Sequence, residues 1–206
     1  MDPPEPADPD TTEALLRRLA EQPEASWTAL LRRVETKLRV LLHFRMSERL
    51  RAVVEEEDLL QETWAEAAHK LERFEYRGPG SLQRWMAGIL RNKLLHAARG
   101  APRVPLPMSA LPNHVSSSSA AAALFDALHK TQPGVADRVL REEAAAKVRE
   151  VLARLPATER EAVLLRVFEG CTGREAAERE GVDESTISLR LQRALAACSR
   201  HLAELA

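Results

Sequence analysis

The sequence predicts an all-α protein made of two small helical domains joined by a flexible linker, with a helix-turn-helix in the C-terminal domain. Apolar residues recur every three or four positions through most of the chain, which is the period of an amphipathic helix. Alanine, leucine, arginine and glutamate dominate the composition, which favours helix over strand. A stretch rich in proline and serine separates two helical blocks, which indicates a linker.

The composition is that of a soluble globular protein. The chain has 206 residues, a net charge of -1 and 45% hydrophobic residues, enough for one domain or two small ones. No apolar run approaches the ~20 residues that cross a bilayer, so no membrane insertion is expected. The N-terminal "MDPPEPADPD" is acidic and lacks the basic and apolar parts of a signal peptide. We therefore expect a cytoplasmic protein.

The sequence contains no arrangement that predicts an enzyme or a bound cofactor. It has no glycine-rich phosphate loop after a strand and no recognisable catalytic triad. Its cysteines and histidines do not have the spacing of zinc ligands. Cys171 and Cys198 are expected to be small core residues, because thiols stay reduced in the cytoplasm. We expect neither catalysis nor a metal.

The N-terminal block begins with a tail, residues 1–24, that we expect to be partly disordered, since its first ten residues hold four prolines and four acids. The helical pattern starts at Thr11, and residues 25–100 form the first domain. Its first long helix has one apolar face of Trp27, Leu30, Leu31, Val34, Leu38, Leu41 and Leu42. A short helix at 47–53 and a long one at 55–74 follow. A Gly-Pro-Gly turn then precedes a helix that Ser81 can cap.

The linker is placed at residues 101–135, where four prolines precede a serine run. The second domain, 136–206, opens with a helix that Pro156 ends. Two capping boxes of the S/T-x-x-E type then predict helix starts, one at Thr158 to Glu161 and one at Thr172 to Glu175. Gly181 allows a tight turn before the last helix.

Charge is distributed unevenly along this nearly neutral chain. No carboxylate occurs from Tyr76 to Phe125, whereas six acids lie between Glu55 and Glu66. Pairing between neighbouring helices would explain this pattern. Separate surfaces for a protein and for a nucleic acid would explain it too, and the length of the gap favours this second interpretation. Near the turn, Phe74 and Tyr76 can stack on an unpaired base or anchor the loop.

The last two helices have the pattern of a helix-turn-helix. The apolar side of the final helix is formed by Ile187, Leu191, Leu195 and Cys198. The opposite side carries residues that can donate hydrogen bonds to bases or phosphates, namely Ser185, Ser188, Gln192 and Arg193, with Thr186 and Arg190 on its flanks. A plain helical hairpin would have the same pattern, so this motif alone leaves DNA binding open.

Two segments resemble bacterial RNA polymerase sigma factors of the extracytoplasmic-function (ECF) group. "DLLQETW", an aromatic and glycine-containing loop and "SLQRWMAGILRNKLLHAAR" resemble sigma region 2. "LARLPATEREAVLLRVFEGCTGREAAEREGVDESTISLRLQRALAAC" resembles sigma region 4. The resemblance covers residues 26–99 and 141–202, in the order typical of the group. It makes residues 25–100 a region 2 domain and residues 136–206 a region 4 domain.

The resemblance implies a sigma factor that binds core polymerase and recognises the −10 and −35 promoter elements. It implies polymerase contacts at Asp58, Leu59, Gln61 and Glu62. The −10 contacts fall on Phe74, Tyr76, Arg77, Arg84, Arg91, Asn92 and Lys93. The −35 contacts fall on Ser185, Thr186, Ser188, Arg190 and Arg193.

The expected partners are core RNA polymerase and promoter DNA, with the free chain a monomer. An anti-sigma factor is compatible with the resemblance, although nothing in the sequence encodes one. The alternative function is a helix-turn-helix transcriptional regulator that does not engage core polymerase, and capture by core polymerase distinguishes the two.

Overall fold

The computed structural model describes residues 11–100 and 137–204, and all regular structure within these two ranges is helical. The all-α prediction is confirmed there. The linker prediction at 101–135 and the first ten residues of the predicted tail lie outside the described residues. No helix in the described ranges has both the length and the apolar character needed to cross a membrane.

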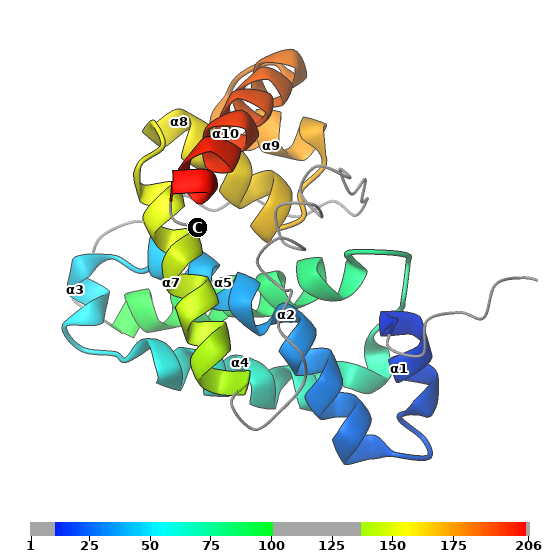
Figure 1. The fold of residues 1–206 in the computed structure, drawn as a ribbon. Coiled ribbons are helices and arrows are strands. Elements are labelled where there is room, and N and C mark those ends of the chain that lie inside the picture. Colours follow the sequence, from blue (N-terminus) through cyan, green and yellow to red (C-terminus); the bar gives the residue numbers. More distant parts are fainter. Residues whose placement is uncertain (1–10, 101–136, 205–206) are drawn as a thin grey trace, which may run out of the picture.

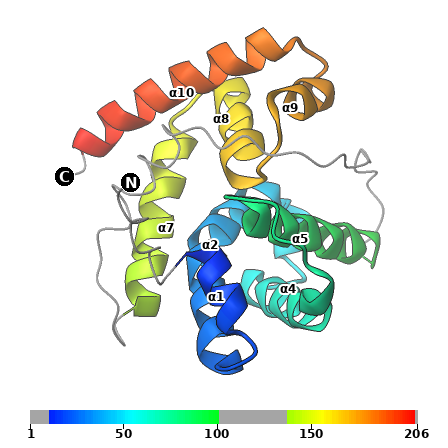
Figure 2. The same cartoon turned by 90° about the vertical axis from the view of Figure 1, so that its right-hand side faces the viewer.

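Six helical segments make up the first block, and α2 is at its centre. They are α1 (Thr12–Arg18), α2 (Pro23–Arg45), α3 (Glu48–Arg51), α4 (Glu56–Lys70), the short η1 (Leu71–Arg73) and α5 (Ser81–Gly100). The predicted apolar face of α2 is confirmed, since Leu30, Leu38 and Leu42 are fully buried. Figure 2 shows α5 between α4 on one side and the C-terminal helices on the other.

The helical pattern predicted from Thr11 is confirmed, because α1 begins at Thr12, within the stretch 1–24 that the sequence predicts to be a partly disordered tail. Thr11 caps α1 by accepting a hydrogen bond from the backbone of Ala14. Leu15 is buried against the core, so α1 packs as part of the first block. A local correction concerns Ser81, which is the first residue of α5 rather than its cap. Its hydroxyl donates to the Gly78 carbonyl at 2.7 Å and so stabilises the preceding turn.

The second block consists of α7 (Asp137–Ala153), α8 (Ala157–Val163), η2 (Leu164–Phe168), α9 (Gly173–Glu180) and α10 (Glu184–Glu204). The capping box of Thr172 and Glu175 at the start of α9 is confirmed. The turn at Gly181 is confirmed by its left-handed φ of 64°. The box predicted at Thr158 is wrong, because α8 begins at Ala157 and its cap position is Pro156, which lies two residues before Thr158 and has no capping side chain.

The two predicted helical domains are present, and they pack against each other. α7 lies along α2, and α8 to α10 sit over α5 and the end of α2 (Figures 1 and 2). A single apolar cluster contains Leu38 and Leu90 from the first block together with Val148 and Phe168 from the second. Cys171 and Cys198 are buried free thiols, as expected. The sequence did not predict this shared core.

Candidate functional site

The outer face of α4 is acidic and open to solvent. Asp58, Gln61 and Glu62 are at least partly exposed and lie three and four residues apart, so they share one side of the helix. Leu59 is only 2% exposed and packs in the core behind them. The structure therefore brings the three polar residues of the predicted polymerase contact together on one surface, with Leu59 supporting the helix from within.

The basic residues of α5 divide between two sides of the helix. Arg84 and Arg91 are seven residues apart and face the second block, where they line one small cavity. Lys93 faces α4 instead, with its Nζ 3.6 Å from carboxylate oxygens of both Glu62 and Glu66. Asn92 is exposed. The predicted −10 residues thus do not form one continuous face, and the pairing between neighbouring helices that the charge pattern also allowed is present at Lys93.

The loop before α5 is anchored by an aromatic contact. The rings of Phe74 and Trp85 lie 4.8 Å apart between centroids, and both pack against the core. Gly78 and Gly80 have φ angles of 101° and 84°, a conformation that glycine adopts without strain. Arg77 is exposed and pairs with Glu75 at 2.7 Å. Phe74 is therefore a packing residue in this structure, and Tyr76 is half-buried with stacking or anchoring both still open.

The helix-turn-helix is formed by α9 and α10, held by its own small core. Leu165, Cys171, Ala176, Ala177 and Ile187 pack together beneath the turn. On α10 the exposed residues recur at helical spacing and form one stripe of Ser185, Ser188, Leu189, Gln192, Arg193 and Ala196. Thr186 and Arg190 are half-buried at its edge, and Arg190 lies 3.4 Å from Glu180.

Two members of this stripe, Leu189 and Ala196, were missed by the sequence interpretation, and Leu189 is the larger. Leu189 is 46% exposed, one of three large apolar side chains exposed among the described residues. A leucine within an apolar repeat is normally assigned to the core, and only its position relative to Ile187 and Leu191 could have indicated otherwise. The stripe combines polar donors with this one apolar group.

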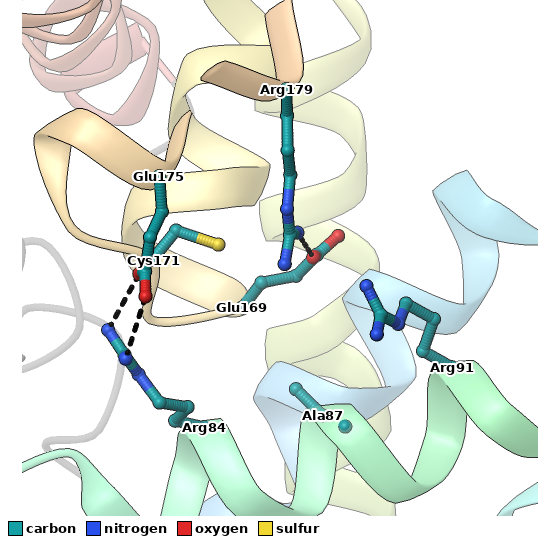
Figure 3. A pocket seen from close by; sticks show the side chains of 8 residues that line it. Arg84, Ala87, Arg91, Glu169, Cys171, Glu175 and Arg179 are labelled. Atoms are coloured by element: carbon teal, nitrogen blue, oxygen red, sulfur yellow. Dashed lines mark hydrogen bonds and ion pairs between the residues drawn. The ribbon is translucent and has the colours of Figure 1, made fainter. Parts of the chain in front are cut away.

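Arg84 is bound by the second block. Its Nη1 and Nη2 atoms donate to the two carboxylate oxygens of Glu175 at 3.4 and 3.2 Å, and Nη2 also donates to the Gly170 carbonyl. Next to it, Gln83 donates to the Phe168 carbonyl at 2.7 Å. Figure 3 shows Arg84 and Arg91 projecting from α5 toward the segment that carries Glu169 and Glu175. The cavity between them measures about 20 Å³, room for about one water molecule.

A second group of ion pairs surrounds Arg45 at the end of α2. Its guanidinium makes two parallel hydrogen bonds to Glu161, at 2.8 and 2.6 Å, and a third to Glu169 at 2.8 Å. Glu169 is also paired with Arg179. Burial acts to lower the pKa of Arg45, but the two carboxylates outweigh it and raise that pKa. These partners are more than 110 positions apart, so sequence spacing carries no signal for them.

No metal-binding cluster of three or more His, Cys, Asp or Glu residues occurs within the described ranges. The described surfaces carry groups suited to binding other macromolecules: an acidic helix face on α4, basic side chains on α5 and a stripe of hydrogen-bonding side chains on α10.

Two family models match the chain, and together they cover more than half of it. The model described as "Sigma-70 region 2" matches residues 30–104, and that described as "Sigma-70, region 4" matches residues 145–198. No curated protein matches. Among solved structures the chain is similar to one described as "Structure of CnrH in complex with the cytosolic domain of CnrY", with 21% identity, 96% of this chain and 99% of that chain covered, and a TM-score of 0.43.

Proposed function

Because the chain belongs to the sigma-70 family of RNA polymerase sigma factors, we propose that it binds core RNA polymerase and directs it to promoters with −10 and −35 elements. Region 2 and region 4 follow each other in the order predicted for an ECF sigma factor. The observation that carries the proposal is that one chain joins the exposed acidic face of α4 to the hydrogen-bonding stripe of α10.

The polymerase contact is assigned to Asp58, Gln61 and Glu62. Their exposure supports this assignment, since three polar groups on one helix face can dock without unfolding the helix behind them. The Nζ atom of Lys93 lies 3.6 Å from a carboxylate oxygen of Glu62, so this cation offsets part of the negative charge at the edge of the face. Leu59 contributes by holding α4 against the core.

Promoter contacts are assigned to α5 with its preceding loop and to α10. Arg77, Arg84, Arg91, Asn92 and Lys93 supply cationic or amide donors for the −10 element, as phosphate and base contacts require. Ser185, Thr186, Ser188, Arg190 and Arg193 serve the −35 element. The exposed stripe adds two residues that can contact base edges. Gln192 has the amide pair that suits adenine, and Leu189 can contact a thymine methyl group.

The protein acts in the cytoplasm, without catalytic chemistry of its own. Transferring one base from the stack to a binding pocket during promoter melting costs a few kcal/mol, which contacts in the pocket can offset. We propose that the free chain is a monomer. An anti-sigma factor is a further partner that membership of the family allows.

Transcription in vitro tests this function directly. Core polymerase is incubated with the purified chain and a pool of randomised promoter fragments, and the transcribed templates are sequenced. We expect transcripts that depend on the chain and share two short motifs, with adenine or thymine at positions facing Gln192 and Leu189. Failure of the chain to be captured by core polymerase would favour the regulator that acts without it.

A further inference from the structure

The first residue of α10, Glu184, has a contact with α9 that the DNA assignments leave unexplained. We infer that Glu184 is a positioning residue for the −35 element: its side chain, seated on Gly173, fixes the angle at which α10 crosses α9 and so the position of the exposed stripe on DNA. The inference rests on the proposed function, because this angle matters to transcription only if α10 contacts a promoter. Glu184 acts through α9 and needs no contact with a base.

The Glu184 side chain lies directly on the backbone of α9. A Cβ placed on Gly173 would lie 2.9 Å from both the Cγ and the Cδ of Glu184, and closer still to a carboxylate oxygen, which is too close for any real side chain. Gly173 is the first helical residue of α9 and its φ is not positive. The reason for glycine at this position is therefore space rather than backbone conformation, and the Glu184 carboxylate fills that space.

The surroundings of the Glu184 carboxylate favour its negative charge. It lies at the start of α9, which is the positive end of the helix dipole. Burial lowers the pKa of Arg166 in η2, and the charges at Cys171 and Glu184 oppose that change. The hydrogen bond and charge of Glu178 raise the pKa of Arg174 in α9, and Glu184 acts in the same direction. Charge as well as shape therefore holds Glu184 on α9.

Contacts between α10 and α9 occur at three residues of α10 that are spaced three apart. Glu184 lies on Gly173 at the start of α9. Ile187 is fully buried in the small core beneath the turn. The Nη1 atom of Arg190 lies 3.4 Å from Oε2 of Glu180, the last residue of α9. Figure 2 shows α9 beside the first turns of α10.

This spacing gives the crossing angle two polar contacts, one on each side of an apolar pivot. The outer two residues, Glu184 and Arg190, are about 9 Å apart along α10. Apolar contact at Ile187 alone resists rotation of the helix weakly, because hydrophobic attraction has no preferred direction. Polar contacts at both ends of α9 oppose that rotation. Loss of the one at Glu184 leaves the N-terminal end of α10 free to turn about Ile187.

The stripe begins at the residue that follows Glu184. Ser185 and Ser188 are exposed in the first turns of α10, the part of a recognition helix whose side chains contact base edges. Each follows a residue that contacts α9, so movement of the turn that carries Glu184 moves both serines. Hydrogen bonds weaken steeply with distance and misalignment. A small rotation of α10 should therefore lower its discrimination between base sequences.

The same contact accounts for an acidic residue beside a DNA-binding stripe. A carboxylate that faces phosphates repels DNA of any sequence. The Glu184 carboxylate is directed at α9 instead, where Arg166 and Arg174 offset its charge. Removing Glu184 therefore has two separable effects. Weaker repulsion favours all DNA equally, whereas loss of the contact lowers only the preference for the correct −35 sequence.

Two substitutions disrupt the contact in different ways. Glu184→Ala removes the carboxylate. Gly173→Ala keeps the carboxylate and the net charge, but its methyl group takes the space, so the flexible end of Glu184 must move. Glu178→Ala is the matched control, because it removes an exposed acid that also pairs with Arg174, at 2.9 Å.

Transcription by the holoenzyme measures discrimination at the −35 element. The two templates are a promoter recovered from the randomised pool and the same fragment with its −35 motif scrambled. Glu184→Ala and Gly173→Ala should each lower the ratio of transcription from the two templates at least about fivefold, as loss of one base contact would. The double variant should lower it no further, because both changes remove the same contact. The control Glu178→Ala should change the ratio by less than about twofold.

Hydrogen exchange of the free full-length chain gives a measurement that needs no promoter. The Ile187 N–H donates to the Asp183 carbonyl at 3.2 Å, so exchange in residues 183–190 reports on the start of α10. Both disrupting variants should accelerate this exchange about twofold to fivefold, as expected when a charge at a helix N-terminus is lost. The control should leave it unchanged.

The outcomes separate the role of Glu184 from the proposed function. An unchanged template ratio in Glu184→Ala and Gly173→Ala would overturn the positioning role while leaving sigma activity intact, whatever the exchange rates. Equal gains on both templates in Glu184→Ala would show that Glu184 acts only through its charge, which would also overturn it. If the parent chain gave no polymerase-dependent transcription, the proposed function and the promoter role would both be wrong, and exchange would still decide whether Glu184 holds α10 on α9.

Discussion

Glu175 has two structural roles that two substitutions can separate. Its carboxylate accepts the Thr172 backbone N–H at 2.7 Å, which caps α9, and also binds Arg84 at 3.2 and 3.4 Å. In Glu175→Gln the amide oxygen can keep the cap, because glutamine serves in a capping box. The amide NH2 group then faces the Arg84 Nη1 donor, so the cap survives while the contact across the interface becomes repulsive.

The magnitude follows from the one hydrogen bond that Glu175→Gln removes, from Arg84 Nη1 to Glu175 Oε1. Hydrogen bonds to charged groups contribute about 1.5–3 kcal/mol, and with side chains only 9% and 13% exposed this pair is little screened. The contact between Arg84 and Glu175 should weaken by a factor of about 10–100, and −10 DNA that uses the same guanidinium should bind more tightly by up to that factor. Fluorescence anisotropy with a labelled −10 duplex measures this without polymerase.

Thr172→Ala is the matched control. It removes the hydroxyl that accepts from the Glu175 backbone N–H and should destabilise the fold by about 0.5–2 kcal/mol in urea unfolding. DNA affinity should stay within about twofold, because Thr172→Ala leaves the Glu175 carboxylate and its hydrogen bonds to Arg84 in place. If Thr172→Ala raised DNA affinity as much as Glu175→Gln, the gain would come from loosening α9, and the competition between Glu175 and DNA would be refuted.

Three further predictions concern the binding surfaces and the core. Asp58→Arg with Glu62→Arg should abolish capture by core polymerase in a pull-down, whereas the exposed pair Glu13→Arg with Glu21→Arg should not; intact capture in the first variant would disprove docking through α4. Alanine at both Arg91 and Lys93 should reduce the salt-dependence slope of promoter binding by the holoenzyme by about 0.9 for each phosphate that is no longer neutralised, and an unchanged slope would contradict the assignment of these two residues to DNA. Burial raises the pKa of Cys171 and Cys198 to about 11 from 9.0. Because the unfolded thiols ionise first, the free energy of unfolding should fall as pH rises from 9 to 11, by up to about 2–3 kcal/mol per thiol; a variant with alanine at both positions should show a smaller fall, and an identical fall would assign the effect to other groups.

Local features could be predicted from the sequence because they depend on neighbours three or four residues apart. The apolar face of α2, the cap at Thr172 and the turn at Gly181 all follow this rule and were confirmed. The cap at Thr158 failed although its pattern was the same, because Pro156, two residues earlier, occupies the cap and α8 begins at Ala157. The start of α1 at Thr12 also agrees with the local pattern, and Leu15 packs that helix against the core.

The sequence by itself determined the helices, their two blocks, the acidic face of α4 and the polar side of α10, since each depends on residue type and helical period alone. Only the tertiary structure decided which charges meet. Arg45 and Arg84 find their carboxylates 116 and 91 positions away, a distance over which sequence spacing predicts no pairing. The burial of these two arginines was likewise undetermined, because it depends on how the two blocks pack. The sequence shows which side chains carry a charge. The fold decides which of them are buried together and so form pairs.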